Sequence, residues 1–527
     1  MFSYSCFYQE NNYEGISNDI LRKCISIAEC VISLHKKQFT PFSVGLALQF
    51  HHEYGSKQLI ETLNSYGFCA NYTEVRRFLT SAANHEISKS QSGLFIPNGI
   101  CLKISGGGFI QEGSDNVDLN TETIDGKNTF HSMARAVFQV ISNQPADLIK
   151  IKRGQEKCLP INEDTTAMMA CLPFKKPKER FGPLRYDDPY SNISVYSKTK
   201  NEVTDMIWVL LRSLTRPMVE VPLKTNAMEQ VVPFWTGFNK ILSDRQPDHV
   251  VVAYPPIIDA KPADMATVYT TMCKCMEMST AVGQGCSVQT FDQQLYAIAQ
   301  LVKWSMPEKF ESHVLRLGGF HTLSCFMSAL GKIWATAGLR DLLLDSGVYA
   351  GCTVDQILQG KQFNRGVRAY TLAYEALTAL NFHAFFQWCS NEDGVANVDE
   401  RFWQELADTH AAFYNHNNAV DLSKLSILFR EQLSPLFTAF SEFCCKTSPT
   451  FRFWEMFLRA VEIILMNVRA ERDGNWLLHL QSVSSMLPYF FVGNKTNYAR
   501  WTPVYLMDMM NLPDDIQEIG IVYFLPL

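Results

Sequence analysis

The feature that most constrains the fold is an alternation of short apolar runs and longer amphipathic segments between residues 250 and 340. Strands that alternate with helices of this length are typical of a parallel sheet covered by helices, so we expect an α/β architecture. The runs that predict strands are 250–254, 287–292 and 313–318, and the segments that predict helices are 265–278, 293–304 and 322–337.

Residues 95–141 add strands of a different kind. Asp125-Gly126 between two apolar or β-branched runs is a hairpin signal. This places Asp115 and Asp118 at the end of one strand and His131 at the start of the next. Three meandering strands followed by alternating helices and strands are the order of the ribonuclease-H-like fold. We therefore expect a ribonuclease-H-like mixed sheet with large insertions, flanked by helical N- and C-terminal regions.

The other segments set the expected domain boundaries. Residues 1–94 have helical patterns, 142–249 are rich in proline and look irregular, and 341–527 have mostly helical patterns. The core is then formed by residues 95–141 together with 250–340.

Two short helical patterns near the N-terminus, joined at Gly67, resemble a helix-turn-helix. Arg76 and Arg77 lie on the second helix and are candidates for nucleic-acid contact. An ordinary helical hairpin is the alternative, because few basic residues lie there to bind phosphates.

Charge gives a second candidate surface. The 47 Lys and Arg against 53 Asp and Glu give a net charge of -6, which excludes a globally basic nucleic-acid binder. Between residues 150 and 185, however, the sequence has nine basic residues and only four acidic ones. A solvated linker is one explanation, and a landing site for a nucleic-acid backbone is the other. The contact candidates there are Lys175, Lys176, Lys178 and Arg180.

The candidate catalytic residues lie at predicted strand ends. Neighbouring strand ends are about 5 Å apart, so Asp292 and either Asp115 or Asp118 could share Mg²⁺ or Mn²⁺. His321 follows Gly318-Gly319-Phe320 at another strand end and is a further catalytic candidate. Structural roles are also open: turn formation for Asp115 and Asp118, capping of a helix for Asp292, and a buried position for His321.

Other chemistries lack their sequence signals. The 15 cysteines include no CxxC pair, and no phosphate-binding loop, dinucleotide fingerprint, zincin or nucleophile-elbow motif occurs. The cysteine usage and the absence of a long apolar run or leader predict an intracellular protein, nuclear or cytoplasmic, that does not enter a membrane. We expect the dense aromatic residues between 476 and 505 to be core, although stacking on bases is the alternative.

Several strings resemble an uncharacterised, mobile-element-derived, transposase-like family of animal genomes. They begin at Asp115 (DNVD), Asp125 (DGKNTFH), Thr290 (TFDQQLY), Leu317 (LGGFH), Trp476 (WLLHL) and Asn497 (NYARWTPVY). The resemblance implies a chain that stops short of a C-terminal segment carrying a further carboxylate. Glu455, Glu462 and Glu471, on a predicted helix over 453–472, are internal candidates for that role.

The sequence thus predicts a transposase- or integrase-like nucleic-acid enzyme, or an inactive copy, with Mg²⁺ or Mn²⁺ as cofactor. Its partner would be a nucleic acid, DNA in the first instance, and the chain could form a homo-oligomer. Two alternatives remain: a non-enzymatic nucleic-acid-binding or scaffolding protein that retains the fold, and a helical protein-interaction module.

Overall fold

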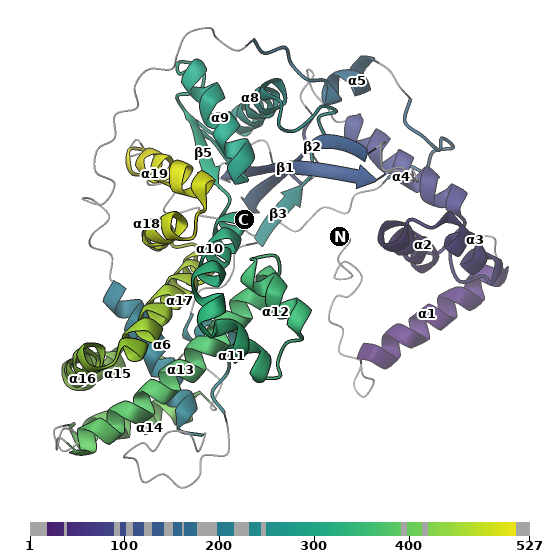
Figure 1. Ribbon diagram of the computed structural model, residues 1–527. Helices are drawn as coiled ribbons and strands as arrows, with labels where there is room; N and C mark the ends of the chain where they lie inside the picture. Colours follow the sequence, from purple (N-terminus) through teal and green to yellow (C-terminus); the bar gives the residue numbers. More distant parts are fainter. Residues whose placement is uncertain are drawn as a thin grey trace. The chain divides into compact units, whose positions relative to one another are not determined.

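The computed structural model describes most of the chain, and its elements are labelled in Figure 1. The chain divides into two compact units, of which the first combines residues 1–100 with 144–170 and the second combines 101–143 with 171–527. The described residues are 18–35, 39–88, 95–97, 99–101, 109–120, 129–141, 151–160, 163–175, 198–215, 231–243, 249–391, 398–413 and 420–512.

The first unit is helical, as the sequence predicts. The expected hairpin is formed by α3 (Lys57–Ser65) and α4 (Tyr72–Ile87), with Gly67 at φ 78° in the turn between them. Ser56 caps α3 by accepting from the backbone N–H of Leu59, as an N-cap serine does. The remaining helices of this unit are α1 (Asn18–His35), α2 (Pro41–Tyr54) and α5 (Glu163–Met169).

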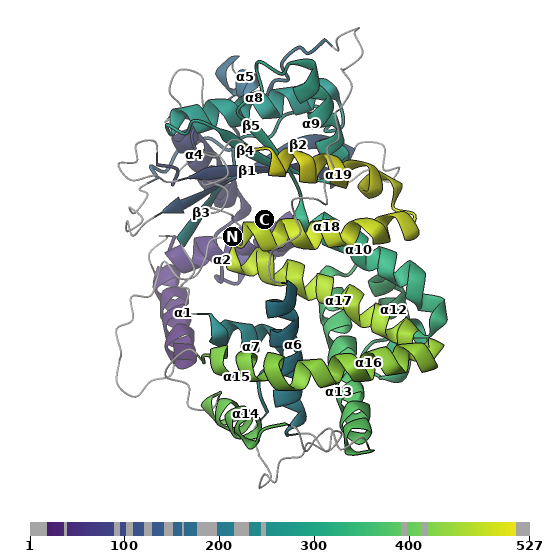
Figure 2. The ribbon, with the colours of Figure 1, turned by 90° about the vertical axis from the view of Figure 1, so that its left-hand side faces the viewer.

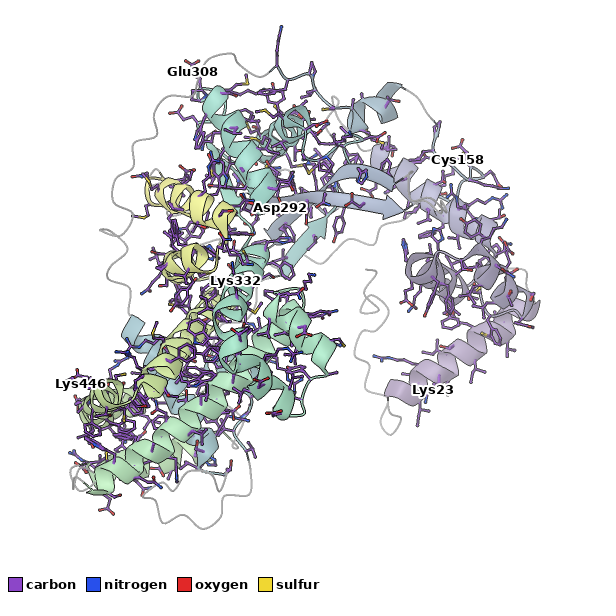
Figure 3. All side chains as sticks on the ribbon, viewed as in Figure 1. Lys23, Cys158, Asp292, Glu308, Lys332 and Lys446 are labelled. Atoms are coloured by element: carbon purple, nitrogen blue, oxygen red, sulfur yellow. The ribbon has the colours of Figure 1, made fainter. Side chains whose placement is uncertain are left out.

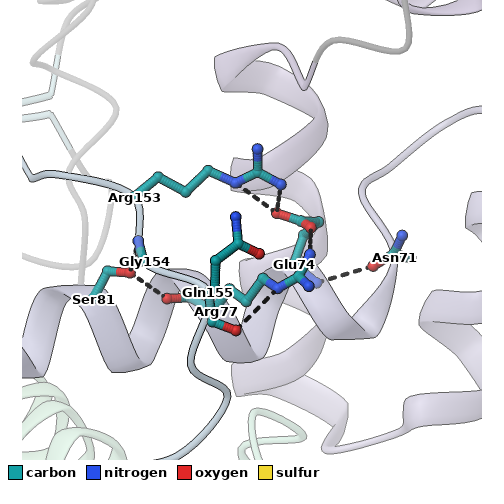
Figure 4. A network of polar contacts seen from close by, with 7 residues as sticks. All are labelled: Asn71, Glu74, Arg77, Ser81, Arg153, Gly154 and Gln155. Carbon is teal, nitrogen blue, oxygen red and sulfur yellow. Dashed lines mark hydrogen bonds and ion pairs between the residues drawn. The ribbon is translucent and has the colours of Figure 1, made fainter.

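A polar network joins α4 to the segment 151–160 (Figure 4). Glu74 is buried and accepts from Arg153 Nη2 at 2.6 Å and from Arg77 Nη1 at 2.6 Å. The Nε of Arg77 also donates to the carbonyl of Gln155. The arginines that surround Glu74 therefore connect segments about 80 residues apart within this unit.

The second unit contains a five-stranded mixed sheet in the order β3-β2-β1-β4-β5. β1 pairs antiparallel with β2, and β2 antiparallel with β3, whereas β1, β4 and β5 run parallel. The strands are β1 (Ile110–Asn120), β2 (Thr129–Ile141), β3 (His249–Ala253), β4 (Ser287–Phe291) and β5 (His313–Leu317).

Helices cover both faces of this sheet. On one face, Glu112 of β1 and Arg135 of β2 lie under α8 (Met265–Ala281), which contacts β1, β2 and β4. The adjacent residue Gln111 points to the opposite face and accepts from Arg316, whose guanidinium lies over the ring of Trp476. Trp476 begins α18 (Trp476–Val492), and α19 (Thr496–Met510) contacts β5 beside it (Figures 1 and 2). The aromatic C-terminal block is mainly core, as expected, because Trp476, Phe490, Trp501 and Tyr505 are buried.

The C-terminal half is a large helical assembly with its own core. The long helix α17 (Pro449–Asp473) packs against α18, α13 and α10, and its buried residues run from Phe457 to Ala470. The other elements are α9 (Gln293–Ser305), α10 (Gly319–Trp334), η2 (Ala335–Ala337), α11 (Leu339–Asp345), α12 (Gly351–Leu358), α13 (Phe363–Asn391), α14 (Glu400–Ala412), α15 (Ser423–Leu428), the π-helical η4 (Phe429–Leu433) and α16 (Ser434–Thr447).

The sequence patterns located the strands and helices of 250–340 within a few residues of their observed bounds. The stretch 142–249 is less irregular than expected, because it also contains α6 (Lys198–Ser213) and α7 (Trp235–Leu242). Residues 207–211 of α6 are fully buried in the core of the helical assembly. No helix among the described residues is both long and apolar enough to cross a membrane.

Candidate active site

The parallel strands β4 and β5 end side by side, and β1 runs past the end of β4. Ser114 is the last β1 residue paired with β4, and it lies opposite Phe291, the last residue of β4. Asp115 and Asp292 therefore occupy equivalent positions on neighbouring strands, where backbones are about 5 Å apart. Figure 3 labels Asp292 at this end of the sheet. β1 continues beyond Asp115 to Asn120, so Asp115 and Asp118 lie within the strand rather than after it.

Asp292 has the capping role that its sequence position allows, and it also lies next to a second carboxylate. Its Oδ1 accepts from the backbone N–H of Leu295 at 2.8 Å, so it caps α9. Burial raises the pKa of the Asp292 carboxyl above its ordinary value, and the negative charge of Asp115 adds to the rise. The two carboxylates are thus close enough to repel each other.

His321 lies next to this carboxylate pair. Its Nε2 is 3.9 Å from Oδ2 of Asp115, and its side chain is 48% exposed, so the expectation of a buried histidine is wrong. Interaction with Asp115, supported by the charge of Asp292, raises the pKa of His321 above its ordinary value. The imidazole is therefore held as a cation more readily than a free histidine.

Asp118 is in a different position from Asp115. Side chains alternate along a strand, so Asp118 and Asp115 point to opposite faces of β1. Asp118 Oδ1 lies 2.6 Å from Nδ1 of His131, which is opposite it on β2. Both side chains line a pocket of about 370 Å³, which Lys261 and Asp292 also line. Asp292 is thus shared between the pocket and the carboxylate pair.

Of the three glutamates nominated on α17, one is close to the strand ends. A Cβ on Gly319, two residues before His321, would lie 2.7 Å from Oε1 of Glu471. The same oxygen is 2.7 Å from Nδ1 of His479, whose Nε2 is 3.0 Å from the hydroxyl of Tyr505. Glu455 instead pairs with Arg459, and Glu462 accepts from the hydroxyl of Tyr374.

The carboxylates do not form a ready-made cation cage. Among the described residues, no three His, Cys, Asp or Glu side chains are grouped closely enough to hold a metal ion. Asp115 and Asp292 are brought together, whereas Glu471 is bound to His479.

Sequence reasoning missed two residues near Asp292. Burial raises the pKa of Tyr498 on α19, and Asp292 contributes to the rise. Lys261 lines the pocket from the segment between β3 and α8. No sequence signal distinguished either residue, because a tyrosine in an aromatic block and a lysine in a loop are both common in proteins without a functional role there.

The nucleic-acid contact candidates are divided by the structure. The Nε of Arg76 donates to the carbonyl of Lys157, and Arg77 joins the network around Glu74, so both are engaged within the first unit. Lys175 is exposed in the second unit. Lys176, Lys178, Arg180 and the C-terminal residues 513–527 lie outside the described residues.

The site is thus a pair of carboxylates on neighbouring strands of a mixed α/β unit, Asp115 within β1 and Asp292 directly after β4. A family described as a domain of unknown function (DUF8702) matches residues 234–525, more than half of the chain, and the chain belongs to this family. The match includes Asp292, His321 and Glu471, while Asp115 and Asp118 precede it. Comparisons with curated proteins and with solved structures return no significant match.

Proposed function

We propose that the protein is a transposase- or integrase-like enzyme that cuts or joins phosphodiester bonds of DNA with a divalent metal ion. The observation that carries the proposal is the position of Asp115 and Asp292 side by side on the neighbouring strands β1 and β4, where β4 ends. Burial, together with the negative charge of Asp115, raises the pKa of Asp292. Perturbed carboxyl groups of this kind are typical of functional sites.

The topology supports the proposal. The strand order 3-2-1-4-5, with an antiparallel β1-β2-β3 meander and parallel β1, β4 and β5, agrees with the order expected of a ribonuclease-H-like sheet. The resemblance to mobile-element-derived proteins points in the same direction. A fold does not define an activity, so the activity is proposed from Asp115 and Asp292 rather than from the sheet.

Asp115 and Asp292 offer two carboxylate ligands to a hard divalent cation, and a further ligand would have to move toward them or come from the substrate. Carboxylate oxygens are the ligands that Mg²⁺ and Mn²⁺ prefer, and a cation between Asp115 and Asp292 would relieve their repulsion. Asp118 is the alternative ligand, from the pocket side of Asp292. The bound ion would polarise the phosphodiester and activate water or a 3′ hydroxyl.

The chain's own residues have distinct roles in this proposal. His321 holds a proton next to Asp115, where a cationic imidazole can donate to a phosphate oxygen. Asp292 is oriented by the α9 backbone that it caps. Glu471 is the candidate third carboxylate, and His479 fixes its position against Gly319.

The test is a strand-cleavage assay with the full chain, labelled DNA and Mn²⁺ or Mg²⁺. Asp115→Asn and Asp292→Asn should each lower the cleavage rate at least about 100-fold. Asn is as good an N-cap as Asp, so Asp292→Asn keeps the cap. Asp345→Asn, at an exposed position at the end of α11, is the matched control and should cleave normally.

Metal binding gives a second readout. Titration of Mn²⁺ followed by electron paramagnetic resonance should show weaker binding in Asp115→Asn and Asp292→Asn than in Asp345→Asn. Wild-type chain that binds DNA but cleaves none with either ion would overturn the enzymatic proposal. That result would favour a non-enzymatic nucleic-acid-binding protein, which is the alternative class.

A further inference from the structure

An exposed aromatic ring lies next to the candidate catalytic histidine. Phe320, on the first turn of α10, is 49% exposed. Its ring centroid is 5.2 Å from that of His321, edge to face, and 4.4 Å from that of Phe363, in a tilted stack. Two neighbouring rings thus extend from the carboxylate site toward the start of α13. We call Phe320 and Phe363 the aromatic platform.

Three exposed cations lie near Phe363 in the chain. Lys361 precedes α13, and Arg365 and Arg368 lie three residues apart on its first turns, so they share one side of the helix. Phe363 lies on the opposite side of α13, so a strand that contacts both the rings and the arginines crosses the start of this helix. Residues 361–374 contain no Asp or Glu. Within the described part of the chain, none of the three cations pairs with a carboxylate. This cation strip (Lys361, Arg365 and Arg368) is therefore open to an anionic ligand.

Backbone contacts fix the platform relative to the site. A side chain at Gly331 of α10 would collide with the carbonyl oxygen of Leu358 at the end of α12. Gly360 has φ 73°, and a side chain there would collide with the carbonyl oxygen of Ser324, also on α10. The segment that leads into α13 is therefore packed directly on the helix that carries Phe320 and His321.

Phosphates bind to unpaired cations, and bases stack on exposed rings. A single-stranded nucleic acid presents both groups at once, whereas the bases of a duplex are already stacked on each other. The charge complementarity is local: Lys361, Arg365 and Arg368 are exposed in a stretch without Asp or Glu, although the chain as a whole has net charge -6.

We propose that the aromatic platform stacks an unpaired base of single-stranded DNA whose phosphates contact the cation strip, beside the Asp115–Asp292 pair. This inference rests on the proposed function and extends it by naming single-stranded DNA as the form of DNA bound at the site. The strand would lie with its sugar-phosphate backbone leading from α13 toward His321.

The experiment measures binding without cleavage. Fluorescence anisotropy of a labelled single-stranded oligonucleotide is followed with the full chain in EDTA. Phe320→Ala should weaken binding about 5- to 100-fold, the range for one stacked base. Phe443→Ala is the matched control, because Phe443 on α16 is 52% exposed, and it should bind like wild type.

The cations are tested by salt dependence. The double variant Arg365→Ala/Arg368→Ala should flatten the slope of log K against log[salt] by about 1.4, or 0.7 for each lost phosphate contact. Arg430→Ala, at an exposed position of η4, should leave the slope unchanged. An oligonucleotide with abasic sites should bind more weakly to wild type and be insensitive to Phe320→Ala.

Equal affinity of Phe320→Ala and Phe443→Ala would overturn this inference, as would an unchanged salt slope in the double arginine variant. Duplex DNA that binds as tightly as the single strand and depends equally on Phe320 would also contradict it. These outcomes are separate from the cleavage test. Loss of binding in Phe320→Ala with no cleavage by wild type would refute the proposed activity alone.

Discussion

β1 carries two carboxylates three residues apart in opposite environments. Glu112 is 2% exposed, and the Nε and Nη2 of Arg135 each donate to it at 2.7 Å. Asp115 is exposed and faces a second carboxylate, Asp292. The buried Glu112 is neutralised by an arginine of the same sheet, whereas the exposed Asp115 has a histidine 3.9 Å away and a second carboxylate beside it. The difference separates charges that stabilise the fold from charges that can bind a ligand.

The largest effect should come from the interior pair. Glu112→Gln leaves the buried Arg135 guanidinium without a counter-charge, which we expect to lower the free energy of unfolding by roughly 3–5 kcal/mol. Denaturant unfolding of the full chain measures this. Asp115→Asn, at an exposed position of the same strand, should change stability by no more than about 0.5 kcal/mol. Equal losses in the two variants would contradict the comparison, and Glu112→Gln/Arg135→Met should recover part of the loss.

The buried histidine of the sheet, His313, gives the next test. His313 is fully buried between Ser287 and Gln289, and burial lowers its pKa to about 3. In the unfolded chain the imidazole of His313 takes up a proton near pH 6.5, whereas in the folded chain it stays neutral at this pH. His313 therefore lowers the free energy of unfolding as pH falls below 6.5, by on the order of 2 kcal/mol at pH 5. His313→Gln should remove this part of the pH dependence, and unfolding curves measured from pH 7 to 5 would show it.

The smallest effect is a change in the pKa of His321. Asp115 raises the pKa of His321, so Asp115→Asn should lower that pKa toward the ordinary value. The effect of pH on the free energy of unfolding is opposite for the two histidines. His321 stabilises the fold at low pH and loses this contribution as pH rises through its raised pKa, whereas His313 destabilises the fold at low pH. NMR titration of the imidazole signals measures the change. An unchanged pKa in Asp115→Asn would show that the two groups do not interact.

The sequence predicted the sheet better than the site. Strands 250–254, 287–292 and 313–318 were recognisable because buried strands are short continuous apolar runs bounded by turns. Asp292 was found because it follows such a run. The choice between Asp115 and Asp118 could not be made from sequence, because it depends on the register between β1 and β4, which no local pattern encodes.

Long-range packing accounts for the remaining differences. Glu471 was one of three equivalent glutamates on a helix, and only the approach of α17 to Gly319 distinguishes it. Helices α6 and α7 were hidden in a proline-rich stretch because tertiary burial, as at Trp208 and Trp235, stabilises them.

The glycine contacts of α10 have a consequence for how this protein can change. Because Gly331 and Gly360 bring backbone against backbone, the spacing between α10 and the segment that leads into α13 is independent of side-chain size. In the proposed complex, substitutions at Lys361, Arg365 or Arg368 would then change the affinity for the strand without shifting this segment relative to α10. A single added methyl group at Gly331 or Gly360 would instead push this segment away from α10, although no polar residue would have been replaced.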